Sequence, residues 1–181
     1  MTDTEQLIER IHATPATAVL AITGAGSQAL AWLLAVPGAS RTLIEATVPY
    51  AEASMVELLG AAPDEFVSVE TALAMARAAL SRAEALSEGD APLIGLGCTA
   101  TIATDRTKRG DHRCAVATVG QGGSRSYDLT LAKGSRDRAG EEEVVSRLVL
   151  YALARASGIE ADVSLGLLDG ERIEEVEVQP S

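Results

Sequence analysis

Two segments of the chain combine residue types that could bind an anion. The first is residues 95–113 (GLGCTATIATDRTKRGDHR), in which small and hydroxylated residues precede four cations within eight positions. Small residues let backbone N–H groups approach an anion, and Arg or Lys side chains then neutralise its charge. The formal net charge of the chain is −11, so a local basic cluster is an exception. We interpret it as a site for a phosphorylated small molecule, the alternative being a solvated basic turn.

The hydroxyls and cations of this segment are the candidates for contacting the ligand: Thr99, Thr101, Lys108, Arg109, His112 and Arg113.

The second segment is the glycine turn 23–27 (TGAGS), which joins an apolar run to a helical pattern. The free N–H groups at such a helix start, here including those of Gly24 and Gly26, can hold a phosphate or an oxyanion. Thr23 or Ser27 could serve as a nucleophile if a base lay near it. For either residue taken alone, a role as a helix cap is the simpler interpretation.

The same glycines also match a dinucleotide-binding turn. Residues 24–29 fit the G-x-G-x-x-A pattern, and Glu45 follows about twenty positions later, where that fold places a ribose-binding acid. However, no later Tyr-x-x-x-Lys pair could donate a proton, and no Lys-Ser/Thr follows the glycines as a P-loop requires. A dinucleotide enzyme is therefore the less favoured interpretation.

Composition restricts the class of protein. A chain of 181 residues with 47% hydrophobic and only 3% aromatic residues is typical of one domain whose core is built from Ala, Val, Leu and Ile. The acidic balance argues against general nucleic-acid binding. No apolar run is long enough to span a membrane, and no secretory signal pattern is present, so we expect a cytoplasmic protein. Cys98 and Cys114 lack CxxC spacing and no His/Cys ligand set is present, so no metal site is predicted. No cofactor is expected either.

Periodicity predicts the elements that position these segments. Helical patterns begin after capping residues such as Thr2, Ser68 and Ser135, and apolar β-branched runs predict buried strands. The predicted helices are 3–13, 28–35, 51–60, 69–86 and 135–156, and the predicted strands are 17–22, 42–48, 92–96, 113–119 and 126–132. The last two strands flank QGGS and predict a hairpin.

Strands that alternate with helices and then give way to a hairpin predict a three-layer α/β/α sandwich with a mixed, mainly parallel sheet. We place this domain at residues 1–158. Residues 159–181 form an acidic extension in which an edge hairpin is slightly favoured over an oligomer contact or a linker.

The ordered motifs resemble a known family, the C-terminal domain of the competence/damage-inducible protein CinA, which includes nicotinamide-mononucleotide amidases. Residues 23–61 follow the order of that family: a hydroxyl-glycine turn opening a helix, a VPGAS segment, a strand, a Tyr-led helix and Leu-Leu-Gly. Residues 67–79 and 134–156 are similar to two further helices of the family. The basic segment 98–113 differs from the glycine-rich family loop and is similar to that of a divergent branch.

The resemblance implies a phosphorylated, nicotinamide-type nucleotide as partner, and a homo-oligomer. It places Thr23 at the position of the nucleophilic Ser and Tyr50 at that of the active-site Tyr, whereas Met55 stands where the family has Lys. A thioether can neither accept that proton nor supply positive charge. Two hypotheses follow: a nucleotide-binding domain with weak or lost amidohydrolase activity, which we favour, and an active amidase that uses Thr23 or Ser27.

Overall fold

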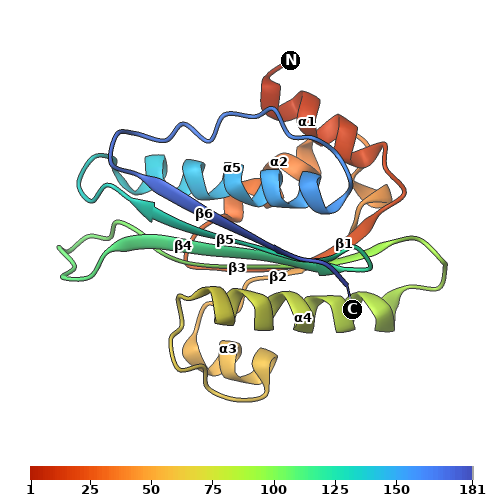
Figure 1. Cartoon of the computed structure of the whole chain (residues 1–181), viewed down its shortest axis with the longest axis horizontal. Coiled ribbons are helices and arrows are strands. Elements are labelled where there is room, and N and C mark those ends of the chain that lie inside the picture. Colours follow the sequence, from red (N-terminus) through yellow and green to blue (C-terminus); the bar gives the residue numbers. More distant parts are fainter. Residues whose placement is uncertain (181) are drawn as a thin grey trace.

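Three layers make up the computed structural model, which describes residues 1–180. Helices α1, α2 and α5 cover one face of a central sheet, and α3 and α4 cover the other (Figure 1). The helices are α1 (Asp3–His12), α2 (Ser27–Ala35), α3 (Glu52–Leu59), α4 (Val69–Leu86) and α5 (Arg138–Ala156), with a short 3-10 helix η1 (Ala39–Arg41). The strands are β1 (Thr17–Thr23), β2 (Leu43–Thr47), β3 (Leu93–Thr101), β4 (His112–Gly120), β5 (Gly123–Leu131) and β6 (Arg172–Val178). The predicted α/β sandwich is confirmed.

The sheet is mixed, in the order β2-β1-β3-β4-β5-β6. Within the described residues β1 pairs parallel with β2 and β3, whereas β3-β4, β4-β5 and β5-β6 pair antiparallel. The sheet is therefore not mainly parallel, because the hairpin and the last strand add three antiparallel pairings to two parallel ones. The carboxyl ends of β1, β2 and β3 all lie at one edge, which is where the glycine turn and the basic segment begin.

Local capping explains where most helices start. Thr2 and Glu5 form the predicted capping box of α1, and the Ser68 hydroxyl accepts the Thr71 N–H at the start of α4. For α5 the predicted cap, Ser135, is wrong. Asp137 caps this helix by accepting the Gly140 N–H at 2.8 Å, so α5 begins three residues later than predicted.

The central strand β3 extends beyond its predicted end. Residues 97–101, expected as a loop, pair with β1 on one side and with β4 on the other. Their small side chains allow α4 to approach, because a Cβ on Gly97 would lie 2.3 Å from the Ala72 carbonyl oxygen. Gly97 therefore permits close helix–sheet packing and does not mark a flexible loop.

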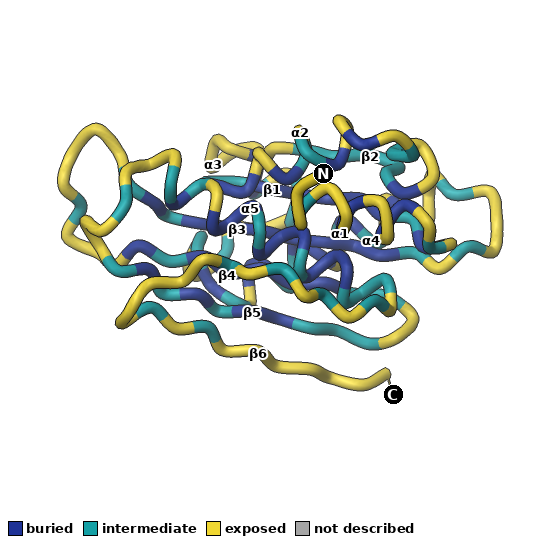
Figure 2. The backbone as a smooth tube through the Cα atoms, turned by 90° about the horizontal axis from the view of Figure 1, so that it is seen from above, coloured by how far each residue is buried: buried dark blue, intermediate teal, exposed yellow. Residues whose placement is uncertain are grey.

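The acidic extension adds a strand to the same sheet. Residues 172–178 pair with β5, whereas 163–168 form no strand, so the favoured edge hairpin is not formed. Residues 159–171 cross the outer helices, held by Arg10 to the Glu160 carbonyl and Arg147 to the Ser164 carbonyl. Figure 2 shows β6 as an exposed edge beside the buried central strands.

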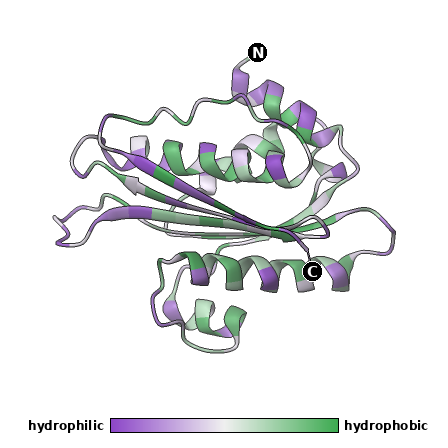
Figure 3. Ribbon diagram, viewed as in Figure 1, coloured by the Kyte–Doolittle hydropathy of each residue, from purple (hydrophilic) through white to green (hydrophobic). Residues whose placement is uncertain are grey.

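The main core lies between the sheet and the layer of α1, α2 and α5. Alanines dominate the smaller contact of α4 with β4 on the other face, and apolar residues run through the central strands and α4 (Figure 3). None of the helices in residues 1–180 is long and apolar enough to cross a membrane.

Tyr127 on β5 is a fully buried tyrosine of this core. Its ring packs edge-on against Tyr151 of α5, with centroids 5.8 Å apart. Its hydroxyl has no hydrogen-bond partner among the described residues. Burial, aided by the charge of Glu175, raises the pKa of Tyr127 well above its ordinary value.

This raised pKa predicts a pH dependence. The neutral phenol contributes stability below the unfolded tyrosine pKa of about 10, and that contribution is lost as the pH rises above it. We expect Tyr127→Phe to be at least as stable as the wild type at pH 7, because it removes an unpaired hydroxyl, and to lose less stability between pH 9 and 11. Urea unfolding at both pH values measures this, and equal losses in the two proteins would contradict it.

Candidate functional site

A small cavity of about 60 Å³ lies where the carboxyl end of β1 meets the start of α5. Its walls come from the turn after β1, from the segment that follows β2 and from the first two turns of α5. The polar residues that line it are Thr23, Ser27, Tyr50, Arg138 and Glu142. The cavity thus brings together the three predicted catalytic residues and adds two charged residues that the sequence analysis did not identify.

The glycine turn has the backbone that this position requires. Gly24 and Gly26 have φ values of 81° and 98°, a region that side-chain-bearing residues rarely adopt. A Cβ on Gly24 would lie 1.9 Å from the Ala100 carbonyl oxygen of β3. The turn is therefore pressed against the end of β3, which brings the two predicted segments into contact.

Glu142 of α5 occupies the N–H groups of this turn. Its two carboxylate oxygens each lie 3.1 Å from the Gly26 nitrogen, and Oε1 also accepts the Gln28 N–H at 2.9 Å. The Ser27 hydroxyl donates to the same oxygen at 3.0 Å. The start of α2 favours negative charge, and in this protein that charge comes from the chain itself.

Arg138, one helical turn before Glu142, binds the other side of the turn. Its guanidinium donates to the carbonyls of Ala103 (2.9 Å) and Gly24 (3.4 Å), and to the Tyr50 hydroxyl (3.4 Å). Tyr50 itself is 64% exposed. Arg138 therefore supplies a cation next to Tyr50 and joins the turn after β1 to the first residues after β3.

Met55 does not face this cavity. Its side chain is 2% exposed and packs in a cluster with Ala21 and Met75, between α3, α4 and the sheet. The position at which the resemblance places the family's Lys is thus a core position in this chain. An ammonium group there would be buried among apolar side chains.

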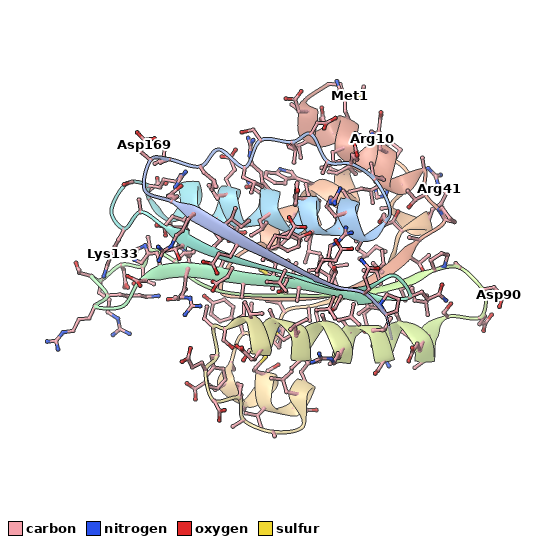
Figure 4. All side chains as sticks on the ribbon, viewed as in Figure 1. Met1, Arg10, Arg41, Asp90, Lys133 and Asp169 are labelled. Carbon is pink, nitrogen blue, oxygen red and sulfur yellow. The ribbon has the colours of Figure 1, made fainter. Side chains whose placement is uncertain are left out.

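The cations of the basic segment do not line the cavity. Lys108 donates to the Thr101 hydroxyl (2.9 Å) and to the Ile102 carbonyl (3.1 Å), which folds the segment back on the end of β3. Lys133, labelled in Figure 4, donates to the carbonyls of Lys108 and Gly110. Arg109 is exposed. These contacts order the segment beside the cavity without directing its charges into it.

Three further residues that were predicted to contact the ligand bind other groups of the protein instead. The Thr99 hydroxyl donates to the Phe66 carbonyl at 2.6 Å on the α4 side of the sheet. His112 is buried and its Nδ1 lies 2.7 Å from Glu141 Oε1, while Arg113 pairs with Asp128 at 3.3 Å. These side chains lie on different sides of the sheet because successive residues of β3 and β4 face opposite sides.

Glu45, the ribose-binding candidate of the dinucleotide interpretation, also lies away from the glycine turn. It forms two hydrogen bonds with Arg82 of α4, at 2.8 and 3.0 Å, which lower the pKa of its carboxyl. This ion pair lines a larger cavity of about 910 Å³ between β2, α3 and α4, whose lining includes none of the predicted catalytic or ligand-binding residues. The geometry gives the dinucleotide interpretation no support.

The prediction of no metal rested on cysteine spacing. Cys98 and Cys114 are buried with their sulfurs 3.9 Å apart, and the hydrogen bond with the Cys98 thiol, together with burial, raises the pKa of Cys114. Among the described residues no group of three or more His, Cys, Asp and Glu side chains could hold a metal ion.

Comparison with known proteins identifies the fold. No family model and no curated protein matches the chain. Among solved structures, it is similar to competence/damage inducible protein CihA from Agrobacterium tumefaciens, with a TM-score of 0.68 and 20% identity over 86% of this chain and 96% of that one.

Two further solved structures are similar to this chain. A CinA superfamily protein from Escherichia coli gives a TM-score of 0.61 and 19% identity over 84% of this chain and 86% of that one. A competence or damage-inducible protein from Enterobacter asburiae gives a TM-score of 0.64 and 16% identity over 87% of this chain and 98% of that one. The predicted resemblance is thereby confirmed at the level of the fold: the chain has the fold of these CinA-superfamily structures.

Proposed function

We propose that this domain binds a phosphorylated small molecule, of the nicotinamide-nucleotide type that the resemblance implies, at the cavity beside the glycine turn. The observation that carries the proposal is the surroundings of Arg138. Its guanidinium contacts two carbonyls and a hydroxyl, and within residues 1–180 no carboxylate forms an ion pair with it. A guanidinium whose charge is not compensated, at the mouth of a cavity, suits a phosphate.

The size of the cavity limits what enters it. About 60 Å³ accommodates a head group but not a whole nucleotide. The rest of the ligand would lie on the rim, where Tyr50 and Val48 are 64% and 52% exposed. The Tyr50 ring offers a face for a planar base, and exposed Arg109 stays a predicted contact from the basic segment.

The first test is thermal stabilisation by nicotinamide mononucleotide. A ligand that binds the folded state raises the melting temperature by an amount that grows with its concentration. We expect a shift in the wild type and none in Arg138→Gln, which loses the charge. Arg147→Gln is the matched control, because Arg147 lies on the same helix and pairs with Glu143 away from the cavity. Equal shifts in the wild type and Arg138→Gln would contradict the proposal.

We further propose that hydrolysis is weak or lost. Two contacts support this: Met55 is buried in the core, and Glu142 occupies the N–H groups that would stabilise an oxyanion. Loss of a general base typically lowers a rate by about 10²–10⁴-fold. Active amidase chemistry is the second candidate, favoured by one observation, the hydrogen bond of the Ser27 hydroxyl to the Glu142 carboxylate.

Ammonia release from nicotinamide mononucleotide separates the two candidates. We expect background release from the wild type and from Ser27→Ala and Thr23→Ala alike. Met55→Lys is expected to gain no activity and to lose stability, because the new ammonium group would be buried without a partner. Release that falls in Ser27→Ala would support the amidase. Release that appears only in a folded Met55→Lys protein would contradict the expectation that position 55 cannot serve the cavity.

A further inference from the structure

Arg138 and Glu142 lie one helical turn apart on α5, a spacing at which opposite charges on a helix surface often pair. They do not pair with each other. Arg138 donates to the Gly24 carbonyl and Glu142 accepts the Gly26 N–H, so the two side chains hold opposite ends of one turn. By contrast Glu143 and Arg147, with the same spacing on α5, form an ion pair at 2.7 Å.

Glu142 occupies the hydrogen-bond donors of the turn. One carboxylate receives the Gly26 and Gln28 N–H groups and the Ser27 hydroxyl, and Ser146 of its own helix donates to it at 3.2 Å. All of these donors would otherwise be free for a bound anion. An anion at the turn would therefore have to displace Glu142 and would be repelled by its charge in a confined, partly dry space.

We propose that Glu142 is a specificity-determining residue that decides where in this cavity an anion binds. It excludes anionic groups from the turn and leaves Arg138 as the cavity's anion subsite. This inference rests on the proposed function in that it concerns the same cavity. It adds that the anion site at the start of α2 is closed by the chain itself and opens when Glu142 is replaced.

Inorganic phosphate is the probe, because it contains only the group in question. Titration calorimetry would compare the wild type, Glu142→Ala, Arg138→Gln and the double variant. We expect Glu142→Ala to bind phosphate roughly tenfold or more tightly than the wild type, because two N–H groups are freed and a like charge is removed. The double variant should still bind phosphate, whereas Arg138→Gln alone should not.

Glu143→Ala is the matched control, because it removes the same charge from the adjacent position outside the cavity. An equal gain in Glu143→Ala would assign the effect to net charge and overturn the proposal. Unchanged phosphate affinity in folded Glu142→Ala would also overturn the proposal. If Glu142→Ala does not fold, Glu142→Gln keeps an acceptor oxygen without the charge, and an unchanged affinity there would overturn it equally.

The two proposals fail separately. If the wild type binds neither phosphate nor nucleotide but Glu142→Ala binds phosphate, the proposed function fails while the role of Glu142 stands. If the nucleotide binds through Arg138 and Glu142→Ala gains no affinity for phosphate, the proposed function stands while the proposed role of Glu142 fails.

Discussion

Glu141→Ala is expected to lower the free energy of unfolding by about 2–6 kcal/mol, because two polar groups that bind its buried carboxylate would each lose their partner, at about 1–3 kcal/mol for each group. Glu141 is 0% exposed. Its carboxylate lies 2.7 Å from His112 Nδ1 and accepts the Ala103 N–H at 2.6 Å. It therefore holds both ends of the connection between β3 and β4, and its loss leaves the Ala103 N–H and the buried His112 ring nitrogen without this partner.

Chemical denaturation of Glu141→Ala and Glu143→Ala measures this effect. Glu143 is next in sequence, and its surface pair with Arg147 should be worth less than about 1 kcal/mol. Hydrogen exchange should also show faster exchange at Ala103 in Glu141→Ala. Similar losses of stability in the two variants would show that the buried contacts of Glu141 contribute no more than a surface pair does.

Gly97→Ala is the second change with a large expected effect. A Cβ at Gly97 would lie 2.3 Å from the Ala72 carbonyl oxygen, 2.6 Å from Met75 Cβ and 2.7 Å from the Ala76 nitrogen. Two of these atoms belong to the α4 backbone, so the whole helix would have to move away from the sheet. Overpacking of a core costs about 1–3 kcal/mol and sometimes more, and we expect a loss at or above the top of that range.

Gly89→Ala is the control for this substitution, because a Cβ there would meet nothing within 4 Å. The two variants would be compared by thermal and urea unfolding. Comparable stability of Gly97→Ala and Gly89→Ala would mean that α4 does not pack as closely on β3 as the structure shows.

Local signals made most of the fold predictable. The capping box at Thr2, the Ser68 cap and the apolar periodicity gave α1 and α4 almost to the residue, because these signals act within a few positions of the chain. The extent of β3 was missed because Gly97 resembles a loop residue in sequence. Only the approach of α4 shows why a glycine is needed there.

The candidate site was predicted in part. The glycine turn and Tyr50 border the cavity because both follow parallel strands that end at the same edge of the sheet. Arg138 and Glu142 were missed because each contacts the turn across more than a hundred residues of chain. The available signal was a pair of opposite charges in the first turns of the helix that follows the hairpin.

The roles of the basic segment were the hardest to predict. Its composition indicates an anion site, but strand register sends His112 to Glu141 and Arg113 to Asp128 on opposite faces of the sheet. Sequence spacing does not show which carboxylate each of these side chains meets.

Arg138 is proposed to bind the phosphate of a nucleotide at this cavity. The most direct measurement is a calorimetric titration of the wild type and Arg138→Gln with nicotinamide mononucleotide and with its nucleoside, which lacks the phosphate. We expect the wild type to prefer the nucleotide by about tenfold or more, as one charge-assisted contact allows, and Arg138→Gln to have no preference. A preference that persists unchanged in Arg138→Gln would contradict it.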